Sequence, residues 1–548
     1  METNIRFDSI LRTENIIKYF TIFDTFSIKI NLMFFKKITL LVLFVFSVSL
    51  NAQIDEKKLD KLIQQTLKTF DVPGISVGIL KDDKIVYAKG FGVRSLTSKK
   101  DMNDNTLVGV ASNSKGFTCF ALAMMVDEGK LNWDDKVRKH IPEFQMHDAW
   151  ITEEFTVRDL VTHRSGLGLG AGDLMFLPEG NDFTVTDVIS NVKYLKPQSI
   201  FRTDFEYNNN MFIIAGEVLK RVSGLTWEEF IETKIMKPVG MTNSKASYNR
   251  VTNRTNSIDA HTRADGKVIQ IPHDWSETAN AAGGIISNVN DMLTWANFLM
   301  NDAVTNDGKR LLSEKQFHEL WQLQTPLKVG KNDSYNSNFR GYGLGWFLTD
   351  VKGGYKQVYH TGGLIGTVTQ FTMIPDLDLA IVVLTNQMNG SAFNTITNTI
   401  KDSYLGFEDR NWLENYGTKN ANYLQYNDSL KVAVYNKVEV AKKDMSLPKP
   451  IQITGTYKDD WFGNILISHD GNTYKILCER SSTLVGELLP YNQTTFVAKW
   501  NNRSYDADVF VQFSFDETGN ATGATMKFIA PITDFSFDFH DLNLKKVK

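Results

Sequence analysis

Strand-like patterns at both ends of one long segment, with helical patterns between them, constrain the fold more than any other feature. Residues 74–95 contain two alternating apolar runs on either side of a polar turn, which is typical of a β-hairpin. Strand patterns return in residues 341–350 and 366–387, whereas residues 130–300 have the spacing of helices. We therefore predict an α/β (α+β) fold. In it, an antiparallel sheet is flanked by helices, an all-helical subdomain is inserted, and both ends of the segment complete the sheet.

An apolar helix is expected near the centre of this unit. Residues 112–128 carry apolar side chains on opposite faces, and Gly129 is a suitable residue to end a helix. A helix that is apolar all round is buried in a large core. It begins with Ser112 and Lys115, which lie one helical turn apart on the same face. The pair is either a solvated helix start or an activated nucleophile near the free N–H groups of the helix.

The same S-x-x-K spacing occurs at Ser190 and Lys193 and at Ser446 and Lys449, to which we assign no chemistry. Ser112 differs from these because it opens the most apolar helical segment of the chain. The spacing alone is therefore a weak signal, and the buried context favours Ser112.

A second motif joins a phenol and an amide. Tyr207 and Asn209 lie two residues apart before an apolar helical segment, so both can point the same way from an extended turn. A phenol can exchange a proton with a serine, and an amide can bind both a lysine and a substrate carbonyl. The alternative is a structural helix start, because Asn is a favoured N-cap residue.

A third motif, His360-Thr361-Gly362-Gly363, lies at the edge of the second strand region. Its glycines would allow a substrate to approach the backbone closely. The alternative is a tight turn with an incidental histidine. His163, which follows another predicted helix, is expected to hydrogen-bond a loop rather than to take part in catalysis.

Taken in this order, the three motifs make the chain resemble the serine β-lactamase and penicillin-binding protein superfamily. The resemblance is strongest to the branch that contains class C β-lactamases, D,D-peptidases, D-aminopeptidases and family VIII esterases. That branch has S-x-x-K, then Y-x-N, then K-T-G or H-x-G. The resemblance covers about residues 54–405 and implies a β-lactamase/transpeptidase-like fold. Four flanking segments agree with it: 157–167, 237–244, 281–292 and 341–347.

The resemblance implies a role for each motif residue. Ser112 attacks a carbonyl and becomes acylated, while Lys115 and Tyr207 form the base that moves its proton. The remaining assignments are Asn209 and His360 as further catalytic residues, the backbone N–H groups of Ser112 and Gly363 as the oxyanion hole, and Asn209, Thr361 and Gly362 as substrate contacts. No cofactor and no metal are implied, and no cluster of His, Cys, Asp or Glu in the sequence has metal-ligand spacing.

The histidine of the third motif separates the chain from true class C β-lactamases, which carry Lys where this chain has His360. A neutral imidazole attracts a substrate carboxylate less strongly than an ammonium group does. We therefore expect a serine hydrolase that acts through an acyl-enzyme, either as a peptidase on peptides containing D-amino acids or as an esterase. The alternatives are a β-lactamase or penicillin-interacting protein and, from another class, a non-catalytic binding or sensor protein.

The expected partner is a small-molecule or short-peptide substrate. The formal net charge is −3, and the lack of a basic excess argues against a nucleic-acid partner. The two cysteines, Cys119 and Cys478, fall in different predicted domains, so no disulfide is expected, and Cys119 is expected in the core.

Residues 1–52 are interpreted as an N-terminal extension with a signal peptide. A lysine pair at 36–37 precedes an apolar stretch over residues 38–50, and a small residue precedes the expected cleavage site. We infer that the true start is Met33 and that the mature protein begins near Gln53, in the periplasm or outside the cell. An uncleaved anchor helix is the alternative, although the apolar stretch is short for a membrane span.

The rest of the chain divides into three predicted parts. Residues 53–405 form the hydrolase domain, and the polar residues 406–447 form a linker with some helix. Short strand patterns at regular spacing in residues 448–548 predict a small all-β barrel. This segment resembles the lipocalin-like β-barrel appended to many such hydrolases. The resemblance implies a role in access to the site or in assembly, with homo-oligomerisation through the barrel as one form of it.

Overall fold

The computed structural model describes residues 54–331, 333–443 and 447–547. The chain divides into two units. The larger comprises Glu56–Thr399 and Asp409–Lys548, and the smaller includes Ile400–Glu408. The predicted signal peptide lies outside the described residues. In the part of the chain that is described, no helix combines the length and the apolar character needed to cross a membrane.

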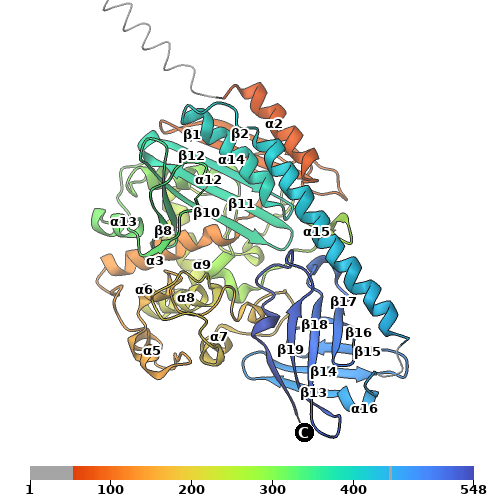
Figure 1. Cartoon of the computed structure of the whole chain (residues 1–548). Coiled ribbons are helices and arrows are strands. Elements are labelled where there is room, and N and C mark those ends of the chain that lie inside the picture. Colours follow the sequence, from red (N-terminus) through yellow and green to blue (C-terminus); the bar gives the residue numbers. More distant parts are fainter. Residues whose placement is uncertain (1–53, 332, 444–446, 548) are drawn as a thin grey trace, which may run out of the picture. The chain divides into compact units, whose positions relative to one another are not determined.

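The larger unit is built on an antiparallel sheet of eight strands in the order β2-β1-β12-β11-β10-β9-β8-β7 (Figure 1). Their bounds are β1 Gly74–Lys81, β2 Lys84–Gly92, β7 Thr325–Leu327, β8 Arg340–Tyr342, β9 Phe347–Val351, β10 Tyr355–Leu364, β11 Thr367–Ile374 and β12 Leu379–Thr385. The N-terminal hairpin joins the later strands through β1 and β12, where Ile79 lies opposite Ile381. This pairing confirms the predicted antiparallel sheet to which both ends of the segment contribute.

Helices pack on the sheet and fill the insertion. Helix α12 packs on β1 and β12, and Gly78 makes room for it, because a Cβ there would lie 2.3 Å from Val289 Cγ1.

In residues 137–239, all of which the structure describes, the regular elements are helical. The main helices are α2 Glu56–Thr69, α4 Val137–His140, α5 Ala149–Glu154, α6 Val157–Leu160, α7 Val185–Asn191, α8 Asn209–Ser223, α9 Trp227–Phe230, α10 Lys237–Val239, α11 Asn280–Gly283, α12 Val289–Met300, α13 Glu314–Leu320 and α14 Gly390–Tyr404. Two short sheets pair β3 Val108–Gly109 with β6 Ile286–Ser287, and β4 Ala260–Ala264 with β5 Lys267–Ile271.

Helix α3 (Ser114–Asp127) is the predicted buried helix, and in Figure 1 it lies between the sheet and helices α5 to α8. A 3-10 turn, Ala111–Asn113, precedes it, so the regular helix begins two residues later than predicted. The physical reason is the hydrogen bonding of the first turn, where the Asn113 N–H bonds the Val110 carbonyl oxygen three residues back, at 3.3 Å. Ala111, the first residue of this turn, has a φ of 51°, in the left-handed region that non-glycine residues rarely adopt. We call Ala111–Asn113 the catalytic turn because it carries Ser112, the predicted nucleophile. Gly129, with φ of 66°, follows the helix as predicted.

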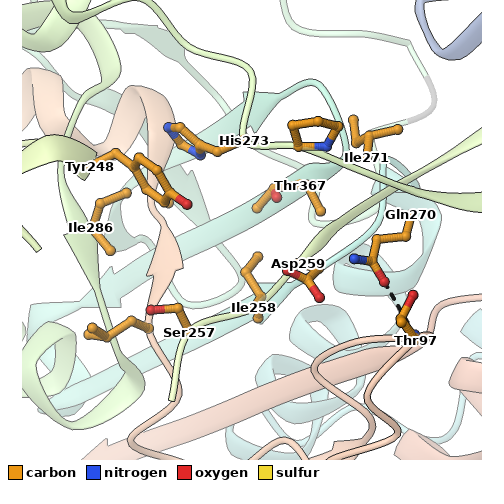
Figure 2. A pocket seen from close by; sticks show the side chains of 14 residues that line it. Thr97, Tyr248, Ser257, Ile258, Asp259, Gln270, Ile271, His273, Ile286 and Thr367 are labelled. Carbon is orange, nitrogen blue, oxygen red and sulfur yellow. Dashed lines mark hydrogen bonds between the residues drawn. The ribbon is translucent and has the colours of Figure 1, made fainter. Parts of the chain in front are cut away.

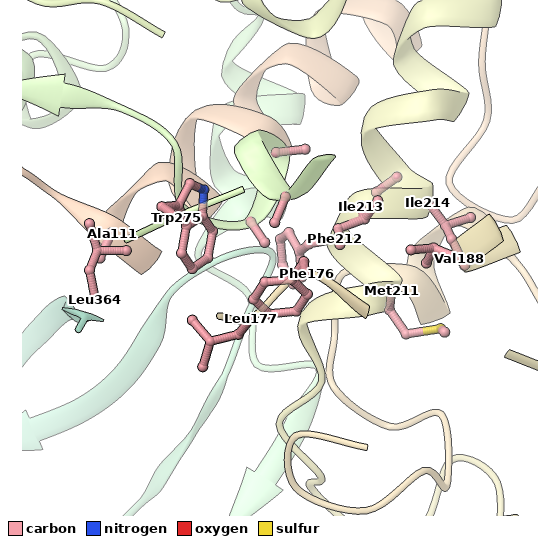
Figure 3. Packing of buried hydrophobic residues seen from close by; sticks show 14 of the residues in the cluster. Ala111, Phe176, Leu177, Val188, Met211, Phe212, Ile213, Ile214, Trp275 and Leu364 are labelled. Carbon is pink, nitrogen blue, oxygen red and sulfur yellow. The ribbon is translucent and has the colours of Figure 1, made fainter. Parts of the chain in front are cut away.

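Apolar side chains hold α8 in place. Figure 3 shows Met211, Phe212, Ile213 and Ile214 of α8 near Val188 of α7, and each of these side chains is at most 2% exposed. Interiors packed in this way move little on average, so the start of α8 is a rigid support for polar side chains.

The C-terminal segment forms a closed eight-stranded barrel, which confirms the predicted all-β barrel. Its strands are β13 Gly455–Asp459, β14 Gly463–His469, β15 Tyr474–Cys478, β16 Val485–Pro490, β17 Thr495–Trp500, β18 Val509–Phe515, β19 Ala521–Phe528 and β20 Asn543–Lys546. Pairing of β13 with β20, in which Tyr457 lies opposite Lys546, closes the barrel. Cys478 in the barrel and Cys119 in α3 are both buried and free.

Helix α15 (Trp412–Ala441), which is 30 residues long, lies within the segment predicted as a linker. Val434 and Val438 of this helix pack against Val497 and Ile529 of the barrel. A second, much shorter helix, α16 (Pro450–Ile453), precedes the first barrel strand. Helix α15 therefore packs against the barrel as well as leading into it along the chain.

Candidate functional site

Lys115 lies at the centre of the site and is fully buried. Its Nζ is 3.0 Å from Ser112 Oγ, 2.8 Å from Asn209 Oδ1 and 2.9 Å from the carbonyl oxygen of Ala282. Burial disfavours the charged form and lowers the pKa of Lys115 to about 7, while the Asp173 carboxylate acts in the opposite direction. A neutral amine has two N–H groups and one lone pair. Asn209 and Ala282 can therefore accept both N–H groups and leave the lone pair facing Ser112.

Tyr207 contacts both Ser112 and Lys115. The Tyr207 and Ser112 side chains are hydrogen-bonded, and Lys115 Nζ is 4.8 Å from the centroid of the Tyr207 ring. Burial raises the pKa of the Tyr207 phenol above its usual range, against the effect of the Ser112 hydrogen bond. At neutral pH the phenol therefore keeps its proton, whereas Lys115 can lose its own.

Asn208 and Asn209, the two asparagines of the second motif, have different roles at the start of α8. Asn208 is the N-cap, and its Oδ1 accepts a hydrogen bond from the Met211 N–H at 3.3 Å. Asn209, the first residue of the helix, turns its amide toward Lys115 instead. The structural interpretation of the motif therefore applies to Asn208, while Tyr207 and Asn209 join the Ser112–Lys115 pair.

A buried carboxylate, Asp173, extends this network, although no sequence motif marks it. Its Oδ2 accepts hydrogen bonds from Asn209 Nδ2 and Ser536 Oγ, each at 2.8 Å. Burial raises the pKa of Asp173 to about 8, against the effects of these two hydrogen bonds and of Lys115. Asp173 is the sole charged residue in the apolar, glycine-rich run 166–178, and that isolation is the signal that could have found it. Among the described residues, no group of three or more His, Cys, Asp or Glu side chains could hold a metal ion.

His360 lies on β10 and is 1% exposed. Its Nδ1 is 2.6 Å from the carbonyl oxygen of Thr361, so Nδ1 carries the proton and Nε2 accepts from the Tyr342 hydroxyl at 3.1 Å. Burial and then the charge of Lys115 lower the pKa of His360 to about 3. The imidazole is therefore neutral, with both nitrogens engaged, and its ring centroid lies 6.2 Å from that of Tyr207. Thr361 itself is half-buried.

The glycines of the third motif let β10 approach the catalytic turn. A Cβ at Gly362 would lie 2.3 Å from the carbonyl oxygen of Val110 and 2.9 Å from Ala111 Cβ. At Gly363, which is exposed, a Cβ would meet nothing within 4 Å. The backbone of Gly363 is therefore open to a ligand, on a strand that packs against the turn carrying Ser112.

His163 supports Tyr207 rather than the reacting atoms. Its Nδ1 accepts a hydrogen bond from the Asn208 N–H at 3.1 Å, which confirms the predicted bond to a loop. Its ring centroid lies 4.2 Å from that of Tyr207, and burial holds its pKa well below the usual range. A neutral imidazole thus fixes the position of the phenol.

A cavity of about 410 Å³ adjoins the segment that leads into the catalytic turn (Figure 2). It is lined by Gly109, three residues before Ser112, and by Thr367 at the start of β11. In its wall Tyr248 stacks on His273 with ring centroids 4.0 Å apart. None of the motif residues lines this cavity, so it is a neighbouring space rather than the reaction site.

Two family models match the chain. The β-lactamase model matches residues 59–404, and a model described as a domain of unknown function, DUF3471, matches residues 451–546. Unguisins hydrolase ungD' of Aspergillus campestris (strain IBT 28561) is 26% identical over 356 residues, which are 61% of this chain and 62% of that protein. Protein flp of Staphylococcus aureus (strain N315) is 24% identical over 343 residues, 60% of this chain and 63% of that protein. The chain thus matches less than two thirds of the length of each of these relatives.

A solved structure shares the fold: the octameric penicillin-binding protein homologue from Pyrococcus abyssi. It has a TM-score of 0.57 and 23% sequence identity, and the match covers 87% of this chain and 98% of that one. The β-lactamase model covers more than half of the present chain and contains all three motifs. The chain therefore belongs to the β-lactamase family, within the serine β-lactamase and penicillin-binding protein superfamily, and carries an additional C-terminal barrel.

Proposed function

We propose that this β-lactamase-family hydrolase is exported, forms an acyl-enzyme on Ser112, and acts on peptides that contain D-amino acids or on esters. Family membership supports the hydrolase class, as does a relative named as a hydrolase. The observation that carries the acyl-enzyme step is Lys115, a buried amine 3.0 Å from Ser112 Oγ whose pKa is lowered to about 7. Burial thus makes a base available at neutral pH beside a nucleophile.

In the acylation step, neutral Lys115 accepts the Ser112 proton as Oγ attacks the substrate carbonyl carbon. Tyr207 is a poor base in the resting enzyme because burial raises its pKa, but its O–H can donate a proton to the leaving group. Once the leaving group has departed, transfer of the Lys115 proton to the Tyr207 phenolate restores both side chains and balances the step. Deacylation runs the same transfers in reverse, with Tyr207 and Lys115 activating a water molecule.

The oxyanion that forms on the substrate carbonyl needs donors that are already in place. The N–H groups of Ser112 and Gly363 lie on the catalytic turn and on β10, which pack together. A donor of this kind stabilises the transition state by about 3 kcal/mol. Asn209 and Thr361 are the proposed contacts to the rest of the substrate, beside Gly362.

His360 affects the choice of substrate because its side chain carries no positive charge. Its pKa of about 3 means that it carries no positive charge at neutral pH. A substrate carboxylate would therefore gain less here than beside the ammonium group found in class C β-lactamases. This favours peptidase or esterase activity over efficient β-lactam hydrolysis.

Export and assembly form a further part of the proposal. The lysine pair and apolar stretch in residues 36–50 support a cleaved signal peptide and a periplasmic or secreted protein. The Pyrococcus abyssi homologue is described as octameric, which supports homo-oligomerisation, with the barrel as the proposed contact. Measuring the N-terminal residue of the secreted protein and its mass in solution tests both points, and a retained N-terminus or a monomer would contradict them.

Intact-mass measurement tests the acyl-enzyme. The mature protein, Ser112→Ala and the matched S-x-x-K control Ser190→Ala are each incubated briefly with four probes. These are a fluorophosphonate, a penicillin, an aryl ester and a D-Ala-terminated peptide. We expect an adduct in wild type and in Ser190→Ala, no adduct in Ser112→Ala, and turnover of the ester or the peptide. No adduct on wild type with any probe would contradict the proposal in favour of a binding or sensor protein. Rapid turnover of the penicillin alone would favour a β-lactamase.

A further inference from the structure

The loop that joins barrel strands β19 and β20 reaches the catalytic network. Ser536 on this loop donates to Asp173 Oδ2 at 2.8 Å. Asp538 accepts hydrogen bonds from the N–H groups of Gly172 and Leu174, at 2.5 and 3.1 Å, which flank Asp173 in sequence. The barrel loop therefore contacts both the side chain of Asp173 and the backbone on either side of it.

A chain of three hydrogen bonds leads from the barrel to the lysine. Ser536 Oγ and Asn209 Nδ2 both donate to Asp173 Oδ2, and Asn209 Oδ1 accepts from Lys115 Nζ at 2.8 Å. The two ends of an asparagine amide have nearly the same shape, so its orientation is decided by its partners. With its Nδ2 bound to Asp173, the amide presents oxygen to Lys115. In the flipped orientation an N–H group would face the amine and compete with Ser112 for its lone pair.

We propose that Asp173 and Ser536 are positioning residues for the Ser112–Lys115 pair, so that the C-terminal barrel completes the network of the hydrolase domain. This inference rests on the proposed acyl-enzyme function. Asp173 acts through Asn209, and Ser536 acts through Asp173, so neither residue needs to contact the substrate. Each side of the contact is buried, with Asp173 at 0% and Ser536 at 7% exposure.

Titratable groups of both domains surround this hydrogen-bond chain. On the hydrolase side, His163 and His360 are neutral because burial lowers the pKa of each, and burial raises the pKa values of the Tyr207 phenol and the Cys119 thiol. On the barrel side, burial raises the pKa values of Asp534 and Asp538, and Asp173 adds to the effect on Asp538. With its pKa raised to about 8, Asp173 is protonated at neutral pH, so its hydrogen bonds rather than its charge link it to Lys115.

The barrel offers a matched control for loss of docking alone. Arg480 also joins the barrel to the hydrolase domain, with Nε 2.7 Å from Asp182 Oδ1 and Nη1 3.2 Å from Asp187 Oδ1. Neither aspartate belongs to the hydrogen-bond chain that leads to Lys115. Arg480→Ala therefore weakens the domain contact without touching the chain.

The test measures the rate of Ser112 labelling by a fluorophosphonate against pH, in the full-length mature protein. Asp173→Asn and Ser536→Ala are each expected to react about tenfold more slowly at their optimum, the upper range of the effect of losing one buried hydrogen bond. Ser536→Thr, which keeps the hydroxyl, is expected to recover most of the rate, and Arg480→Ala to behave as wild type. The acidic limb of the profile is expected to move to lower pH in both slower variants, because a flipped Asn209 turns an N–H group instead of its oxygen toward Lys115 and disfavours the ammonium form. Equal losses in Ser536→Ala and Arg480→Ala, or an unmoved limb, would overturn the proposal.

A second measurement separates this proposal from the proposed function. If wild type does not react with any probe, the acyl-enzyme function fails, but the positioning role can still be judged. The titration of Lys115 is followed by NMR on protein labelled with ¹³C-lysine, with Lys115→Arg to assign its signal. A lower pKa for Lys115 in Asp173→Asn than in wild type supports the role, and an unchanged pKa overturns it.

Discussion

Two S-x-x-K segments of this chain show the same spacing and opposite surroundings. Ser112 and Lys115 lie at the start of the buried helix α3, and Lys115 has Ser112, Asn209 and Ala282 around its Nζ. Ser190 is exposed near the end of α7, and Lys193 Nζ lies 5.1 Å from the ring centroid of Tyr194.

The difference lies in solvation rather than in residue type. Water stabilises an exposed ammonium group, so a lysine in solvent stays charged at neutral pH and cannot act as a base. In the buried segment that solvation is lost, and carbonyl and amide oxygens replace it only in part, so the pKa of Lys115 falls to about 7. The spacing brings hydroxyl and amine together, but burial makes the amine a base.

The largest expected effect comes from removing each lysine in turn. Lys115→Met deletes the base, so we expect the rate of Ser112 acylation to fall by about 10³-fold, within the usual range for general-base catalysis. Lys193→Met should leave the rate unchanged. Stopped-flow measurement with an aryl ester compares the two variants. A comparable loss in both would contradict the distinction between the buried and the exposed segment.

The next effect concerns the packing of β10 against the catalytic turn. Gly362→Ala would place a Cβ 2.3 Å from the Val110 carbonyl oxygen, which is backbone and cannot easily move. We expect a loss of about 1–3 kcal/mol in the free energy of unfolding, together with slower acylation, because the turn carrying Ser112 must shift.

Gly363→Ala is the control for this prediction, since a Cβ there meets nothing within 4 Å. Its stability should match wild type, and any effect should appear in substrate binding. Urea unfolding of both variants makes the comparison. Equal stability of Gly362→Ala and wild type would show that the turn is held in another way.

The sequence predicts most of the fold and part of the candidate site. The sheet and the barrel follow from alternating apolar residues and turns, because local periodicity reports which face of a strand is buried. The three motifs predict Ser112, Lys115, Tyr207 and Asn209 as site residues because their order along the chain is characteristic. Asp173 and Ser536 could not be identified in this way, since their contact joins residues 363 positions apart. The left-handed backbone of Ala111 also depends on tertiary packing rather than on local preference.

A smaller effect is expected in the pH dependence of stability. The folded protein releases the Lys115 proton near pH 7, whereas the unfolded chain holds it up to the ordinary lysine pKa of 10.5. Between these values the unfolded state binds more protons, so stability rises with pH. Asp173, with its pKa raised to about 8, has the opposite effect below pH 8, where it makes stability fall as the pH rises.

The contribution of Lys115 to the pH dependence of stability is therefore best measured between pH 8 and 10. Across it, wild type should gain stability relative to Lys115→Met, and Lys193→Met should follow wild type. Urea unfolding at several pH values measures these differences. Parallel curves for wild type and Lys115→Met would mean that burial does not change the proton affinity of Lys115.

The most direct test of the account is the titration of Lys115 itself in the wild-type protein. NMR on protein labelled with ¹³C-lysine can follow its side chain, and Lys115→Arg identifies the signal. We expect a midpoint near pH 7, at which the amine becomes free to take the Ser112 proton. A Lys115 signal that remains in its protonated form through pH 9 would contradict it, because a charged ammonium group cannot serve as the base.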